Sequence, residues 1–147
     1  MSSDNDLAKE MKKAAKRVEL NLKLTSARGT LITLEAKVEK LKKKIARFTT
    51  ALTEINTGNE SFQQVKSSMD GIDIDASSWS GEKADKVNVE LANLKSDISS
   101  IATKVDDAVE TIEAEKKEAE NDLISAEAKV ASQATVVQNL INSINSL

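Results

Sequence analysis

The residue types that most often carry protein chemistry are nearly missing from this chain. Its 147 residues include no His, no Cys, no Tyr and no Pro. Without His and Cys, the common zinc, haem, iron–sulfur and disulfide sites cannot form, and neither can a Cys- or His-based nucleophile. The sequence also contains neither of the two common glycine-rich phosphate-binding motifs. We therefore expect no catalytic residue, no metal, no cofactor and no small-molecule ligand, and a protein that is not an enzyme.

Three closely spaced carboxylates, Asp70, Asp73 and Asp75, are the remaining candidates for a metal site. An EF-hand calcium loop needs Gly at its sixth position and Glu at its twelfth. Counted from Asp73, those positions hold Ser78 and Ala84. Because both discriminating positions fail, we interpret the three carboxylates as turn acids or as charges near a helix N-terminus.

The basic run at residues 40–47 resembles a nucleic-acid patch in composition. Its two large apolar members, Leu41 and Ile45, belong to a longer helical stripe, so the lysines occupy the outer face of the same helix. No aromatic side chain interleaves with them to stack on bases. We expect a solvated face and no nucleic-acid partner.

The elements that must position these residues are long helices. In the first half, apolar residues recur in alternating steps of four and three, which is the heptad pattern of a coiled-coil seam. These are Leu20, Leu24, Ala27, Leu31, Leu34, Val38, Leu41, Ile45, Phe48, Leu52 and Ile55. The pattern predicts a helix over about residues 5–55. Upstream, Leu7, Met11, Ala14 and Val18 keep the rhythm in a different phase, so these turns either bend, fray or face a different neighbour.

Residues 56–80 are predicted to connect two helices. Asn56-Thr-Gly58 is a helix-stop signal, and three of the four glycines lie at positions 58, 71 and 81. The spacing of Phe62, Val65 and Met69 allows two further turns of helix that close at Asp70-Gly71. We expect a small apolar cap over the helix ends, formed by Phe62, Met69, Ile72, Ile74 and Trp79.

The heptad pattern returns in the second half and predicts a helix over about residues 81–147. Its first seam is Ala84, Val87, Leu91, Leu94, Ile98, Ile101, Val105, Ala108 and Ile112. The apolar spacing lapses in the acidic stretch 113–122, where we expect a stutter, with a break near Asn121-Asp122 as the alternative. It resumes at Ala119, Leu123, Ala126, Val130, Ala134, Val137, Ile141 and Ile144.

Together these patterns predict an all-α fold, an antiparallel helical hairpin of two long coiled-coil-like helices in one domain, residues 1–147. Residues 1–55 carry 13 basic and 7 acidic side chains, whereas residues 56–147 carry 8 and 17. If the helices end near 55 and start near 80, the numbers of facing residues add up to about 135. That register pairs the basic residues 12–17 with the acidic stretch 113–122.

The same register leaves the C-terminal residues beyond about 131 without a facing partner. Residues 130–147 carry no charge, and their apolar side chains lie at helical spacing. A two-helix hairpin also buries only one narrow face of each helix. We therefore predict an interaction surface for another chain, with a tail folded back on its own hairpin as the alternative. The surface comprises Val136, Val137, Leu140, Ile141, Ile144 and Leu147.

The segment Ser78-Trp79-Ser80-Gly81 lies between the two heptad helices. In this arrangement the chain resembles the WXG-type superfamily of type VII secretion. Its length and long connector are most similar to the small helical adaptors associated with LXG-domain toxins of Gram-positive bacteria. The resemblance implies a turn motif at Trp79 and Gly81. It also implies a partner, the helical N-terminal region of an LXG-type toxin, with a second small helical protein as a further candidate.

The chain departs from the superfamily in one respect. The usual export signal is an aromatic residue followed four positions later by an acid. Here Phe48 and Phe62 are followed at that offset by Leu52 and Lys66, and no aromatic residue follows Trp79. A partner would then have to supply the signal.

The expected function is that of a non-enzymatic adaptor, or chaperone, which binds the toxin and promotes its export by type VII secretion. The alternative is a self-associating structural coiled-coil protein, such as a flagellar or tail component. The first residues include no apolar signal-peptide core, and no window is apolar enough to insert into a membrane. We expect a cytoplasmic protein before export, or one secreted with its partner.

Overall fold

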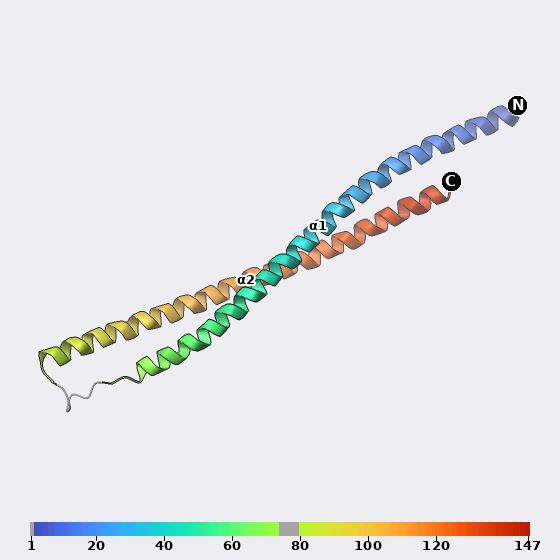
Figure 1. Cartoon of the computed structure of the whole chain (residues 1–147). Helices are drawn as coiled ribbons and strands as arrows, with labels where there is room; N and C mark the ends of the chain where they lie inside the picture. The colour runs from blue at the N-terminus through green and yellow to red at the C-terminus, as the bar shows by residue number, and fades with distance from the viewer. Residues whose placement is uncertain (1, 74–79) are drawn as a thin grey trace. The chain divides into compact units, whose positions relative to one another are not determined.

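The chain folds into two long helices. The computed structural model describes residues 2–73 and 80–147, and Figure 1 shows the course of the chain. Helix α1 spans Ser2–Asp70 and helix α2 spans Glu82–Asn145. The two helices pack against each other as a helical hairpin, with no strand among the described residues. The predicted all-α hairpin is therefore confirmed.

The hairpin divides into two compact units, and each combines a part of α1 with a part of α2. The first unit comprises residues 1–44 and 119–147, and the second comprises residues 45–118. The predicted seam of α1 is confirmed along its whole length, because all eleven positions from Leu20 to Ile55 are buried or half-buried.

Helix α1 is longer than the sequence pattern predicts. It does not stop at Asn56-Thr-Gly58 but continues to Asp70, so much of the expected connector is helical. The predicted end at Asp70-Gly71 is confirmed: the Gly71 amide donates to the Ser67 carbonyl at 3.1 Å, and the helix goes no further.

The extension of α1 follows from a seam that apolar residues alone do not reveal. After Ile55 the half-buried positions continue in steps of four and three, at Asn59, Phe62, Lys66 and Met69. Two of these side chains are polar, which hides the heptad pattern. Gly58 lies off this seam and costs only about 1 kcal/mol against Ala within a helix, too little to end one that is packed on its neighbour.

A glycine with an unusual backbone conformation directly precedes helix α2. Gly81 has a φ of 104°, and its carbonyl accepts the first helical hydrogen bond, from the Asp85 amide at 3.0 Å. Glu82 and Asp85 place negative charge in the first turn, where the helix dipole favours it. Gly81 therefore provides the turn into α2.

The seam of α2 differs from its predicted course at four positions and in the stretch 113–122. Leu94, Ile101, Ala108 and Ala134 are exposed, and the neighbouring Lys95, Ala102, Val109 and Gln133 take their positions. From Lys95 onward the seam then runs in steps of three and four to the C-terminus, passing through Lys116 and Ala119. The expected stutter or break near 113–122 is absent, because a lysine fills the seam position that the apolar pattern lacked.

Candidate functional site

The seam of the first unit is built from small and medium-sized side chains. Leu20, Leu24 and Ala27 of α1 are 7–8% exposed, and Ala119 and Ala126 of α2 are 2% exposed. Alanines at the contact allow the two backbones to approach closely, since interaxial distance depends on the side chains at the crossing. This narrow seam holds the N-terminal part of α1 against the C-terminal part of α2.

The register of the first unit differs from the predicted one. The Gln133 side-chain amide donates to the Ala27 carbonyl at 3.0 Å, across the seam. The predicted register would have placed residue 24 against residues 111–112. The difference arises because α1 continues to Asp70 instead of stopping near residue 55, which moves the partner of each α1 residue toward the C-terminus.

The C-terminal apolar surface is consequently not an overhang. Val137, Leu140, Ile141, Ile144 and Leu147 are half-buried, and only Val136 counts as exposed, at 44%. Val136 and Leu140 line one hollow together with four α1 residues, Lys23, Ser26, Ala27 and Thr30. The alternative of a tail folded onto its own hairpin therefore describes this segment better. Whether it also contacts a partner stays a prediction.

The turn motif is described only in part. Trp79 and Ile74 lie outside the described residues, so the expected apolar cap is not seen as a whole. Gly81 is exposed and opens α2. Its φ of 104° belongs to a region that favours glycine. This is a backbone reason for glycine at this position, independent of any partner.

A lysine that the sequence analysis did not single out secures the end of α1. The Lys95 ammonium donates to the Ile72 carbonyl at 2.8 Å and to the Asp70 carbonyl at 3.5 Å. Carbonyls at a helix C-terminus lack helical partners, and a lysine is well suited to satisfy them. The signal for Lys95 in the sequence was its spacing, because Lys95 follows the seam residue Leu91 by four positions and lies next to Leu94.

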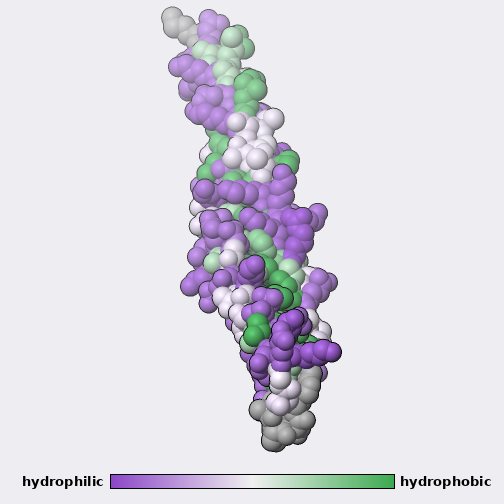
Figure 2. Space-filling model, turned by 90° about the vertical axis from the view of Figure 1, so that its left-hand side faces the viewer, coloured by the Kyte–Doolittle hydropathy of each residue, from purple (hydrophilic) through white to green (hydrophobic). Residues whose placement is uncertain are grey.

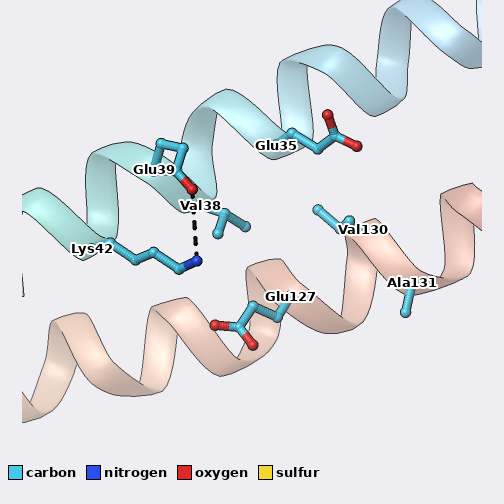
Figure 3. A pocket seen from close by; sticks show the side chains of 7 residues that line it. All are labelled: Glu35, Val38, Glu39, Lys42, Glu127, Val130 and Ala131. Carbon is cyan, nitrogen blue, oxygen red and sulfur yellow. Dashed lines mark ion pairs between the residues drawn. The ribbon is translucent and has the colours of Figure 1, made fainter.

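A shallow hollow of about 500 Å³ lies along the seam of the first unit (Figure 3). Val38 and Val130 project into the space between the helices, and three carboxylates and one lysine surround them. The lysine, Lys42, forms an ion pair with Glu39 at 3.6 Å. Among the described residues no cluster of acidic side chains is arranged to hold a metal ion. The hollow therefore combines apolar seam residues with acidic side chains at its edge. Its lining residues include no nucleophile–base pair.

The ion pairs near the N-terminus lie within α1. Lys13 pairs with Glu10 at 3.7 Å, and Glu19 pairs with Lys16 at 3.6 Å and with Lys23 at 2.9 Å. The hydrogen bond from Lys23, reinforced by the charges of Lys16 and Lys23, lowers the pKa of Glu19 below its ordinary value. Lys13 and Lys16 therefore do not make the predicted pairs with residues 113–122, because the register differs.

The outer surface of α1 carries large apolar side chains that α2 does not cover. Leu7, Met11, Val18, Leu22 and Ile32 are 61–68% exposed. Figure 2 shows green hydrophobic patches among the purple hydrophilic surface on the face of the molecule that it displays. Within the described residues, no helix has a stretch long and apolar enough to cross a membrane.

Comparison with protein families gives a match over most of the chain. Residues 15–142 match the model of the YwqH-like family, which covers parts of both helices and all of the connection between them. No curated protein and no solved structure matches the chain.

Proposed function

Since the chain belongs to the YwqH-like family, we propose that it is a non-enzymatic adaptor that binds the helical N-terminal region of an LXG-type toxin. In this role it promotes export of that toxin by type VII secretion. The family match over residues 15–142 is the observation that carries the proposal, because proteins of this family are associated with LXG toxin systems. We also infer a place in the wider WXG-type class, from Trp79 and Gly81 between two long helices.

The geometry of the described residues supports a binding role. Nearly all of the described residues belong to the two helices, and each helix buries one narrow face against the other. The large apolar side chains on the outer face of α1 remain exposed. A further helix added to such a hairpin would remove this apolar surface from water, at roughly 25 cal/mol per Å² of buried area. The adaptor would act in the cytoplasm before export, alone with the toxin or with a second small helical protein.

The proposal is tested by deleting the gene for this protein in its native host and measuring secretion of the LXG toxin that is encoded beside it. We expect toxin export to stop and to return when the wild-type gene is restored. Purification of the toxin's N-terminal region should bring this protein with it at a fixed ratio. Normal export in the deletion strain, with no copurification, would overturn the proposal.

A further inference from the structure

The unpaired end of the hairpin is the N-terminal end of α1. From residue 3 to residue 19 every described side chain is exposed, and burial begins at Leu20. At the other terminus even Leu147 is half-buried. The sequence pattern had predicted the opposite, a C-terminal overhang. The first turns of α1 therefore extend beyond the part that α2 covers among the described residues.

An apolar stripe starts on this overhang and continues along the outer face of α1. Its apolar members are Leu7, Met11, Ala14, Val18, Leu22 and Ile32, and Thr25 and Gly29 occupy two further positions at the same spacing of three and four. We call these eight positions the outer stripe. Each stripe position from Val18 onward precedes a seam position, such as Leu20, by two residues, which is about 200° around a helix. The outer stripe therefore faces away from α2, and α2 cannot cover it.

The surroundings of the outer stripe are strongly basic. Residues 7–32 contain seven Lys and Arg side chains and only two acidic ones, Glu10 and Glu19. Both acids already form ion pairs with lysines of the same helix. Seven basic and two acidic side chains give residues 7–32 a net charge of +5, and Arg17 and Arg28 lie along one edge of the outer stripe. A helix that packs on the outer stripe would therefore be favoured if acidic residues flank its own apolar stripe.

A second copy of this chain does not meet these requirements. Two outer stripes packed together would bring two segments with a net charge of +5 each against one another, which is unfavourable. The exposed large apolar residues of α2 are Val89, Leu94, Ile101, Ile124 and Val136. Leu94 and Ile101 lie one heptad apart, and the other three lie on different faces of the helix. The described part of α2 therefore offers no matching stripe of its own.

We infer that the outer stripe is the docking site for one amphipathic helix of a different protein, with apolar residues at three–four spacing flanked by Asp and Glu. Residues 7–32 would accommodate about 39 Å of such a helix, at 1.5 Å per residue. The inference rests on the proposed function, since the toxin's N-terminal region would supply the helix. It assigns the contact to the N-terminal half of α1 instead of the C-terminal surface.

The test compares a double variant, L22D with I32D, with a matched control, I124D, in the full chain. Leu22 and Ile124 are each 68% exposed, and Ile32 is 67% exposed, so none of the three substitutions should unfold the hairpin. Circular dichroism melts verify this. The probes are the toxin's N-terminal region and two synthetic 26-residue helices with leucines at stripe spacing, one flanked by Glu and the other by Lys.

We expect the toxin region and the Glu-flanked helix to bind the wild type and I124D, and the double variant to bind both at least about 100-fold more weakly. The Lys-flanked helix should not bind. Equal binding of the toxin region to the double variant and the wild type would overturn the docking site and leave the adaptor function standing. If the toxin region binds neither protein, the adaptor function fails, and the docking site stands only if the Glu-flanked helix still requires the outer stripe.

Discussion

At the scale of single residues, two glycines of this chain have opposite roles. Gly81 has a positive φ of 104°, whereas Gly58 lies inside α1, and neither has an atom within 4 Å of where a Cβ would be placed. Because only the backbone differs, G81A should destabilise the protein by about 1–2 kcal/mol, and G58A should stabilise it by about 1 kcal/mol. Thermal melts followed by circular dichroism measure both; a shift of the same sign in the two variants would contradict this account of the turn.

At the scale of the helices, the register of the first unit is the feature most open to test. Cysteines at positions 27 and 133, where the Gln133 amide reaches the Ala27 carbonyl, should crosslink within one chain through a short bifunctional maleimide. Cysteines at 24 and 111 are the control. They should not crosslink, because residues 1–44 pack with residues 119–147. Mass spectrometry after denaturing separation gives the answer, and crosslinking of only the second pair would restore the register expected from the sequence.

At the scale of the whole molecule, the adaptor and the structural rod predict different assembly. Residues 7–32, which hold the outer stripe, have a net charge of +5 that disfavours self-pairing, so the isolated chain should keep one mass across a concentration series in light scattering. With the toxin's N-terminal region at 100 times its dissociation constant, linkage predicts an added stability of about 2.7 kcal/mol and a higher melting temperature. Open-ended growth with concentration, unaffected by the toxin region, would favour the rod.

Much of this architecture could be predicted from the sequence, because heptad spacing is a local property. The eleven seam positions from Leu20 to Ile55 and the hairpin fold follow directly from it. The phase slip before Leu20 indicated turns that bend, fray or face a different neighbour, and residues 3–19 are exposed in the structure. These N-terminal turns contain the start of the outer stripe, from Leu7 to Val18.

What only the tertiary structure decided is where the seam ends and which residues face each other. Asn59, Lys66, Lys95 and Lys116 occupy half-buried seam positions, although polar residues do not mark a seam in an apolar pattern. Packing against the other helix compensates for their polarity, and Lys95 bonds free carbonyls at the end of α1. The extension of α1 to Asp70 then shifts the register, because each helix fixes the partner of every residue in the other. The overhang therefore lies at the N-terminus, since the C-terminal apolar residues are needed to cover α1.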